Sequence, residues 1–512
     1  MGDMMKKIFT ALLCISIPFI LVSSNSIHTI PSRENKGNNG EWNREFGGKH
    51  ADDLCDIQYT SDGCFILAGR TWSFGHGPDT CDTWFLKIDK NGNELVNKTF
   101  GGRGYDVAQS VVEAEDGYLI GGYTESLAAD RGDFWLIKVD HEGDMLWNKT
   151  YDGRDLDNIH KVINTGDGYL MVGDIRFPGD DHDSNVWLVK VDWQGNEMWN
   201  RTFGGAYTDY GDDVLQTDDG YVISGMSYSY ETNGGWDAWL IKVDENGVEQ
   251  WNRTYGWGQF ETRSFVARAD DGYVLAGRTE YTPMGGQAFL IKVDERGHQQ
   301  WSKAYGNGLE HVWDIDRVDG GYVLTGTQSV ISVGGSDAWL VRVDEQGNEL
   351  WTKKLGGSVR EGADALVAVD GYYYVAAGKT YTEPFDRNAW ILKCDDTPPP
   401  QLTITRPREQ YLYLFDREIL PTERTIIFGK ITVEAQVSDE SRIDSVAFYV
   451  TVESYEHRPR KVLIEPPYTW TWDEPVIVVW QPAEITVAGR YGGASGIAVD
   501  HVWPIWIYNF GI

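Results

Sequence analysis

The chain has 512 residues, of which 45 are Lys or Arg and 78 are Asp or Glu, so its formal charge is −33. This balance excludes nucleic acids and anionic membrane surfaces as partners, because both are recognised through clustered Lys and Arg. The length is sufficient for two or more domains.

The N-terminal segment has the pattern of an export signal. Lys6 and Lys7 precede an apolar run from Ile8 to Val22, and small serine residues follow it. This pattern predicts a signal peptide over residues 1–25. The run is shorter than the about 20 apolar residues of a membrane span, and an uncleaved N-terminal anchor is the alternative. We expect residues 26–40 to be a flexible segment and the mature protein to be secreted or held at the cell surface, without an integral membrane segment.

A block of about fifty residues recurs seven times between residues 41 and 395. Neighbouring copies are 50 to 52 residues apart. A fixed period of this length indicates an array of supersecondary units that bury their apolar faces only against one another. Each copy carries one aromatic residue at the same place: Trp84, Trp135, Trp187, Trp239, Phe289, Trp339 and Trp390.

Each copy is expected to contain four antiparallel strands and almost no helix. Between Phe203 and Tyr255, D-G and N-G turns separate short runs that are rich in Val, Ile, Tyr, Trp and Thr. Such dipeptides between apolar runs indicate tight hairpins, and these residue types favour strands. Seven four-stranded units predict an all-β fold, a seven-bladed β-propeller.

The ends of the repeat array indicate how the ring closes. A copy of the last strand of the repeat, Glu41–Gly48, precedes the first complete repeat, whereas the seventh repeat stops at Asp395 without that strand. We therefore predict a propeller over residues 41–395 whose seventh blade is completed by the N-terminal strand.

The repeat also resembles known families. The D-x-x-G-x-x-x-W pattern, found for example from Asp244 to Trp251, resembles the tryptophan-containing repeats of quinoprotein-type propellers. The whole repeat resembles secreted archaeal and bacterial β-propeller repeat proteins. This resemblance covers residues 41–395 and implies an architecture, whereas fold likeness alone does not assign an activity.

A second domain is predicted after the proline-rich linker at residues 396–400. The stretches Ile443–Val450 and Pro467–Asp473 resemble bacterial immunoglobulin-like modules of exported proteins, although Gly489–Ala498 departs from the usual D-x-x-G-N turn. The resemblance implies a C-terminal immunoglobulin-like β-sandwich over residues 401–512. Such modules serve as spacers or adhesion domains.

An acid recurs where each repeat returns to the centre of the ring. Because it follows the F-G-G of the preceding outer strand, we expect it at the mouth of the central channel. One interpretation is a ligand-binding ring, which would suit calcium or sugar hydroxyls; the other is structural, with each acid capping backbone N–H groups at the joint with a neighbouring blade. The seven acids are Asp52, Asp106, Asp157, Asp209, Glu261, Glu310 and Glu361.

The long loops on the same face vary between repeats and carry aromatic residues. Trp72, Tyr228, Trp236 and Tyr281 are the candidates for stacking on a ligand. More carboxylates stand two residues before the strand aromatic, at Asp82, Asp133, Asp237 and Asp337. Aromatic rings beside carboxylates favour a binding face for a glycan or a cell-surface protein.

Two residue types suggest covalent chemistry in an exported chain. N-x-T sequons recur on the predicted outer strand and are candidates for glycosylation; their asparagines are Asn97, Asn148, Asn200 and Asn252. An even number of cysteines outside the signal peptide leaves disulfides or free thiols as alternatives; these cysteines are Cys55, Cys64, Cys81 and Cys394.

These observations favour an exported, non-catalytic binding or surface-scaffold protein. No catalytic residue is assigned, because the histidines show neither H-x-H nor H-E-x-x-H spacing. We expect no cofactor, with calcium as the one candidate ion and no assigned metal ligands. The alternatives are a polysaccharide-cleaving enzyme that uses two channel carboxylates and a quinone-dependent dehydrogenase.

Overall fold

The structure is a computed structural model of the whole chain. It describes residues 35–36, residues 42–399 apart from short gaps, and, beyond residue 401, the strands alone. The gaps between residues 42 and 399 are 78, 129–131, 152–156, 177–183, 231–234, 257–262, 280–285, 307–309, 331–334, 356–359 and 381–386. All regular elements of the described part are strands.

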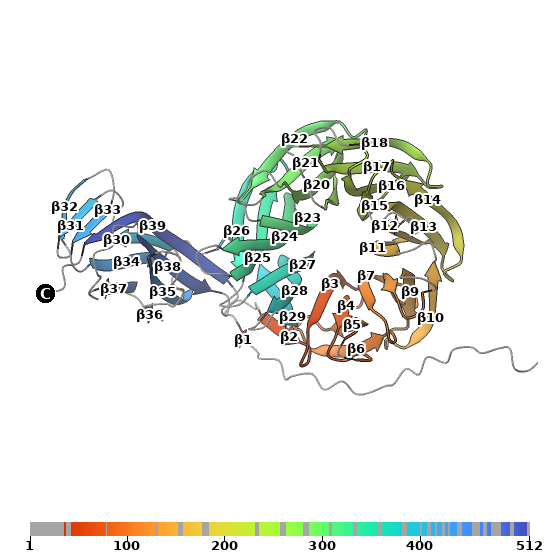
Figure 1. Cartoon of the computed structure of the whole chain (residues 1–512), viewed down its shortest axis with the longest axis horizontal. Helices are drawn as coiled ribbons and strands as arrows, with labels where there is room; N and C mark the ends of the chain where they lie inside the picture. The colour runs from red at the N-terminus through yellow and green to blue at the C-terminus, as the bar shows by residue number, and fades with distance from the viewer. Residues whose placement is uncertain are drawn as a thin grey trace, which may run out of the picture.

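Seven antiparallel sheets stand around one central axis (Figure 1). Within each sheet the strands are paired in chain order, with the first strand innermost. Blade 1 comprises β3 (Asp52–Tyr59), β4 (Phe65–Thr71), β5 (Asp82–Ile88) and β6 (Glu94–Phe100), and blade 2 comprises β7 (Asp106–Ala114), β8 (Gly117–Thr124), β9 (Asp133–Val139) and β10 (Met145–Tyr151). Blade 3 comprises β11 (Asp157–Thr165), β12 (Gly168–Arg176), β13 (Ser184–Asp192) and β14 (Glu197–Phe203), and blade 4 comprises β15 (Asp209–Thr217), β16 (Gly220–Ser227), β17 (Asp237–Asp244) and β18 (Glu249–Tyr255). The predicted seven-bladed propeller is confirmed.

The remaining three blades follow the same plan. Blades 5 to 7 comprise β19 (Phe265–Ala269), β20 (Gly272–Arg278), β21 (Ala288–Asp294), β22 (Gln299–Tyr305); β23 (Glu310–Val318), β24 (Gly321–Val330), β25 (Gly335–Asp344), β26 (Glu349–Leu355); and β27 (Arg360–Val369), β28 (Tyr372–Thr380), β29 (Arg387–Asp395). Blade 7 thus takes three of its strands from the C-terminal end of the array.

The N-terminal strand closes the ring. Strand β2 (Trp42–Phe46) pairs with β29 in antiparallel register, from Trp42 opposite Lys393 to Phe46 opposite Ala389. It thereby becomes the fourth strand of blade 7, and β1 (Asn35–Lys36) pairs with its outer edge. The closure predicted from the ends of the repeat array is confirmed.

The hydrophobic core lies between neighbouring blades. The recurring third-strand tryptophan is almost completely buried, as at Trp84, Trp135 and Trp239. Core clusters combine residues from two adjacent sheets, and the cluster around Trp84 also includes Trp42 and Tyr374 of blade 7. Each blade therefore buries its faces only because its neighbours are present, as the period of the sequence predicts.

The outer strand of each blade is fixed to the next blade by a glycine turn. Gly247 has a φ of +74°, and a Cβ there would lie 2.8 Å from the ring of Trp199, on the outer strand of the preceding blade. Arg201, two residues further, donates to the Asn246 carbonyl at 2.9 Å. A side chain at Gly247 would therefore meet both a strained backbone and the indole.

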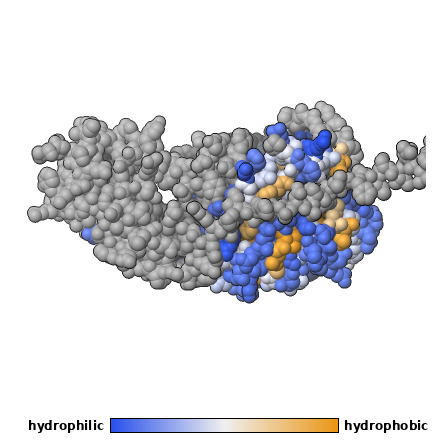
Figure 2. Space-filling view, turned by 90° about the horizontal axis from the view of Figure 1, so that it is seen from below, coloured by the Kyte–Doolittle hydropathy of each residue, from blue (hydrophilic) through white to orange (hydrophobic). Residues whose placement is uncertain are grey.

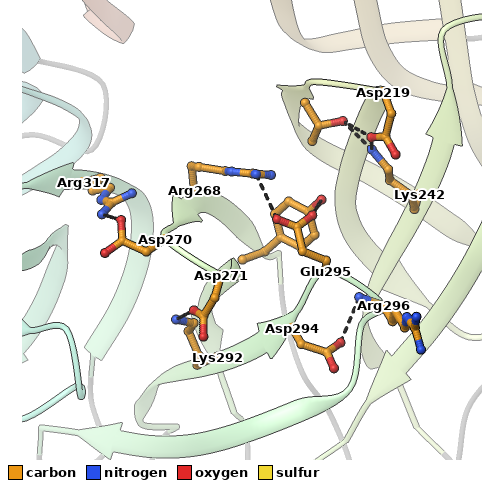
Figure 3. Close-up of polar contacts among 12 residues, drawn as sticks. Asp219, Lys242, Arg268, Asp270, Asp271, Lys292, Asp294, Glu295, Arg296 and Arg317 are labelled. Carbon is orange, nitrogen blue, oxygen red and sulfur yellow. Dashed lines mark hydrogen bonds and ion pairs between the residues drawn. The ribbon is translucent and has the colours of Figure 1, made fainter.

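The face opposite the loop-rich one carries a repeated ion pair (Figure 3). The third-strand lysine of each of blades 1 to 5 pairs with an aspartate in the first hairpin turn of its own blade, as Lys242 does with Asp219 at 2.5 Å. The ammonium also lies over a tyrosine ring of the next blade where Lys87 faces Tyr118. From the sequence we expect this lysine to pair with the aspartate two residues later or with the next blade. In blades 1 to 5 the ion pair is made instead with the hairpin turn of the same blade, and the contact of Lys87 with Tyr118 reaches the next blade, as the second alternative expects.

Strands after the linker form two sheets. One consists of β30 (Leu402–Arg406), β34 (Ile431–Val437) and β37 (Tyr468–Trp472); the other includes β31 (Tyr411–Leu414), β32 (Arg417–Pro421), β33 (Thr425–Phe428), β35 (Ile443–Val452), β36 (Lys461–Leu463), β38 (Ala483–Tyr491) and β39 (Gly496–Tyr508). Strand β39 pairs with β26, the outer strand of blade 6, through Lys354 and Leu355. The C-terminal strands thus attach to the rim of the ring, and their assignment as an immunoglobulin-like module stays a prediction.

The described surface is mainly hydrophilic. Figure 2 shows one face, on which hydrophilic residues predominate and the hydrophobic areas are small and separate. Exposed apolar side chains such as Leu95, Leu146 and Leu350 stand singly on the outer strands of different blades. Scattered single residues of this kind need no partner to explain them.

Candidate functional site

The open face of the ring is the face on which the inner strands begin and the second strands end. Five of the acids predicted at the channel mouth stand there as the first residue of an inner strand, and Glu361 is the second residue of β27. Glu261 and the side chain of Glu361 lie outside the described part. The acids with described side chains are fully buried: Asp52, Asp106, Asp157, Asp209 and Glu310.

Asp106 shows how such a buried carboxylate is held. Its Oδ2 accepts from the Gly102 backbone N–H at 2.8 Å and from the Ser126 hydroxyl at 2.5 Å. Its Oδ1 accepts from the Thr124 hydroxyl and from the Ser126 backbone N–H. Gly102 follows the outer strand of blade 1, so this acid fixes the chain where it passes from one blade to the next.

The same contacts recur in other blades. Asp52 accepts from the Gly48 backbone N–H at 2.8 Å, and Asp209 accepts from that of Gly205 at 2.9 Å. Buried polar groups with complete hydrogen bonding are part of the scaffold. The geometry therefore supports the structural interpretation of the acid ring, while a ligand role for these residues stays a prediction.

The acids two residues before the third-strand aromatic are buried too: Asp82, Asp133, Asp237 and Asp337. The Nδ1 atom of His76, on the open-face loop of blade 1, lies 2.8 Å from Asp82 Oδ2. Burial raises the pKa of Asp82 to about 6, against the opposing effect of the His76 contact. This carboxyl is therefore partly protonated just below neutral pH.

Open-face aromatics gather on blade 4. Tyr210 and Trp236 stack with ring centres 5.6 Å apart and planes at 19°. Tyr228 lies 5.5 Å from Trp236, and Tyr207, which is 57% exposed, lies edge-on to Tyr228 at 5.5 Å. The structure thus brings two predicted residues, Tyr228 and Trp236, together with two that the sequence did not single out; Tyr281 lies outside the described residues. We call these four residues the blade 4 aromatic cluster.

Trp72 is separate from this cluster. It stands on the open-face loop of blade 1, where the guanidinium of Arg70 lies 5.3 Å from its ring centre. Arg70 also donates to Asp53 at 3.1 Å. The two predicted aromatic positions on blades 1 and 4 therefore do not form one surface with shared contacts.

Carboxylates also link the inner strands to one another along the channel wall. Asp213 accepts from its own neighbour, the Val214 N–H, at 2.8 Å and from the Val266 N–H of blade 5 at 3.0 Å. Inner strands are sheet edges with unpaired N–H groups, and a carboxylate between two edges satisfies one group on each. Asp56 and Asp314 bridge their neighbouring blades in the same way.

Lys161 interrupts this pattern in blade 3. Its Nζ lies 3.3 Å from Asp56 Oδ1, so its side chain spans from blade 3 to blade 1 past the intervening blade. Burial opposes the charged ammonium, but the carboxylates of Asp56, Asp314 and Asp213 together raise the pKa of Lys161. One lysine thus supplies the positive charge among three acids of the channel wall.

A second polar group joins blades 3, 4 and 5 near the open face. His160 Nε2 lies 3.1 Å from Asp174 Oδ1, and His160 Nδ1 donates to the Gly211 carbonyl at 2.9 Å. Asp212 Oδ1 lies 3.7 Å from His160 Nδ1 and 3.5 Å from Arg263 Nε. Three of these side chains are nearly buried, while that of Arg263 is 41% exposed. Arg263 is therefore the solvent-exposed member of the group.

The surroundings shift the pKa values of the buried members of this group. Burial lowers the pKa of His160 to about 3. Burial raises the pKa of Asp174 to about 7 and that of Asp212 to about 6, with Arg263 opposing both shifts. Because Nδ1 of His160 donates to a carbonyl, its Nε2 is the acceptor, and a protonated Asp174 can donate to it. Perturbed groups of this kind concentrate at functional sites.

The sequence interpretation missed His160, Asp212 and Lys161 as members of one channel wall. His160 and Asp212 both occupy the β-bulge of their inner strands, a feature that often redirects side chains beside active sites. A signal was present: the third residue after the channel-mouth acid is not conserved between blades, and only blades 4 and 7 share a residue type there, aspartate. These residues are Cys55, Gln109, His160, Asp212, Ser264, Trp313 and Asp364.

No disulfide joins the four candidate cysteines. Cys55 stands on inner strand β3, Cys64 in the following turn and Cys81 before β5, whereas Cys394 belongs to blade 7. Burial raises the pKa of Cys55 and that of Cys81 to about 12 each, so both remain protonated thiols at neutral pH. Of the two alternatives, disulfides or thiols, the structure has thiols.

The sequon asparagines have a structural contact. Trp84 Nε1 donates to Asn97 Oδ1 at 2.8 Å, and the equivalent indoles donate to Asn148 and Asn252. The Asn200 amide donates to Glu197 at 2.6 Å. These contacts explain why asparagine recurs at this place; glycan occupancy stays a prediction.

Neither a metal centre nor a membrane helix is found in the part of the chain that the structure describes. No group of three or more His, Cys, Asp or Glu side chains there is arranged to hold a metal ion. No helix among those residues is long and apolar enough to cross a membrane.

No family model matches the chain, and no curated protein matches it. Similar solved structures include the periplasmic gluconolactonase of Pseudomonas aeruginosa, with 11% identity and a TM-score of 0.42 over 62% of this chain and 94% of that one. The β-propeller domain of the trilobed protease from Pyrococcus furiosus has 12% identity and a TM-score of 0.37 over 68% and 96%. The propeller architecture follows from the strand pairing described above, and these neighbours give no information on activity.

Proposed function

We propose that the chain is an exported binding protein that holds a saccharide on the open face of blade 4. The observation that carries this proposal is the blade 4 aromatic cluster. Aromatic rings provide flat apolar surfaces with polar edges, which suit the C–H faces and hydroxyls of a sugar. Export itself rests on the N-terminal sequence pattern.

The cluster breaks the symmetry of the repeat. The second residue of the inner strand, Tyr210 in blade 4, is Asp53, Val107 and Asn158 in blades 1 to 3. The residue before the third-strand acid is Trp236 in blade 4 but Cys81 in blade 1. A residue that the fold requires would recur, so this set of rings serves something other than blade packing.

The proposal is tested by glycan-array screening followed by calorimetry on the purified protein. Trp236→Ala should weaken binding of the best array ligand at least about 10-fold, as expected for an aromatic anchor. The matched control is Trp193→Ala, an indole that is 42% exposed on the opposite face. A silent array, or equal losses in the two variants, would contradict saccharide binding at blade 4.

Polysaccharide cleavage is the second candidate function. The observation that favours it is the pair of buried carboxyls Asp174 and Asp212, whose pKa values are raised to about 7 and about 6. Groups that titrate near neutral pH can act as general acid or base. Incubation with a polysaccharide panel should then release new reducing ends with the native protein and not with Asp212→Asn. Absence of reducing ends with the native protein would remove this candidate.

A further inference from the structure

The guanidinium of Arg263 is available to a ligand. Its side chain is 41% exposed, and Nε lies 3.5 Å from Asp212 Oδ1. Within the described part of the chain this ion pair is its one polar contact, so the two terminal nitrogens carry open N–H groups. Arg70, on the open-face side of blade 1, is by contrast engaged, because it donates to Asp53.

Arg263 adjoins the blade 4 aromatic cluster. A Cβ on Gly211 would lie 2.8 Å from Val172 and Val186 of blade 3, so Gly211 faces that blade. Side chains alternate along a strand, and Tyr210, which precedes the bulge at Asp212, therefore points to the other side, toward blade 5. The Asp212 carboxylate confirms this direction, because it accepts from the Ser264 N–H of blade 5 at 3.1 Å.

The spacing suits a single sugar unit. Residues two apart on a strand are separated by about 7 Å. Tyr210, which stacks on Trp236, thus begins a short stretch of β15 that ends at Asp212, the ion-pair partner of Arg263.

The electrostatics near Arg263 permit an anion in spite of the net charge of −33. Burial raises the pKa of Asp174 to about 7, so this neighbour is about half protonated at neutral pH. At physiological salt, charges more than about 8 Å away are screened. The remote acids of the surface therefore matter less than the groups beside the guanidinium, which are its ion-pair partner Asp212 and the partly protonated Asp174.

We propose that the saccharide held on blade 4 is an acidic one, whose carboxylate binds the guanidinium of Arg263 while its ring lies on Tyr210 and Trp236. The planar fork of arginine matches a carboxylate with two parallel hydrogen bonds, which a hydroxyl cannot reproduce. This inference rests on the proposed saccharide function and names its ligand class.

The experiment compares matched ligands on the full protein. Trimers of galacturonate, glucuronate and mannuronate are titrated by calorimetry beside their carboxyl-reduced, neutral counterparts. The acidic member of the recognised pair should bind about 10-fold to 100-fold more tightly, the range expected for charge-assisted hydrogen bonds. Arg263→Gln should abolish that preference, and Arg263→Lys should retain only part of it. Arg103→Gln, an exposed arginine on the open-face loop of blade 2, is the charge-matched control and should leave the preference intact.

Each outcome decides one of the two proposals. Equal affinity for acidic and neutral trimers, with Trp236→Ala abolishing both, would overturn the acidic assignment and leave saccharide binding standing. An equal loss in Arg103→Gln and Arg263→Gln would reduce the preference to general charge and overturn the role of Arg263. Failure of every trimer to bind, together with a silent array, would remove the proposed function itself. Thermal melting of each variant excludes misfolding as the cause.

Discussion

Replacing Asp106 by asparagine tests whether the channel-mouth acids serve the scaffold or a ligand. The amide keeps the shape of the side chain but puts an N–H₂ group where one carboxylate oxygen accepted two hydrogen bonds. The Ser126 hydroxyl can rotate and accept from that amide, whereas the Gly102 backbone N–H, donating at 2.8 Å, cannot. A buried orphaned N–H costs about 1–3 kcal/mol. The remaining bonds also lose their charge, so we expect Asp106→Asn to lower the free energy of unfolding by about 2–4 kcal/mol.

The assay is urea denaturation followed by tryptophan fluorescence, in the presence of a chelator and without any glycan. The control is Asp79→Asn, an exposed carboxylate on the same face, which should change stability by less than about 0.5 kcal/mol. If the Asp106 carboxylate served a ligand instead, it would destabilise the ligand-free protein, and replacing it would raise the free energy of unfolding. A variant as stable as the native chain, or more stable, would therefore refute the structural reasoning.

Three further predictions concern ring closure, pH and the channel. Trp42→Ala should cost about 3–5 kcal/mol in urea unfolding, because this 6% exposed indole joins β2 to the core; an unchanged midpoint would show that β2 does not hold the ring. The pKa of Asp174 is about 7 in the folded protein and 3.8 for an unperturbed aspartate, so between these two pH values the folded state binds one more proton than the unfolded state. The free energy of unfolding should therefore fall by about 1.4 kcal/mol for each unit by which the pH rises in that range. Asp174→Asn should remove that slope in urea titrations from pH 4.5 to 8, and an identical slope would contradict it. Lys161→Met should lower the melting temperature more at pH 8 than at pH 5, because unpaired channel carboxylates ionise as pH rises; equal losses would argue against the charge role of Lys161.

The repeat made the fold predictable, because the same pattern of strands and turns can be compared across seven copies in the sequence. The N-terminal copy of the outer strand was enough to predict the closure that β2 and β29 form. The channel-mouth position of Asp106 and its equivalents also followed, because each begins an inner strand.

The candidate site was predictable only in part, because its residues belong to different blades. His160, Asp212 and Arg263 come from blades 3, 4 and 5, and the first two stand at the bulges of their inner strands. Tyr228 and Trp236 stood out as loop aromatics, whereas Tyr210 looked like an ordinary strand residue until its ring was seen against Trp236. Contacts between blades depend on how the inner strands are oriented around the axis of the ring. The repeat period in the sequence does not give that orientation.

The pairing of β2 with β29 also bears on the order of folding. Phe46 and Ala389 are opposite each other in that pair but are separated by 343 residues along the chain. Blades 1 to 6 consist of hairpins between sequence neighbours, which form quickly, whereas a contact of such long range forms slowly. Strand β2, which is synthesised before the other strands of all seven blades, is thus the last to find its partner. Until then it presents an unpaired edge, which makes the period before ring closure the time when this protein is most exposed to aggregation.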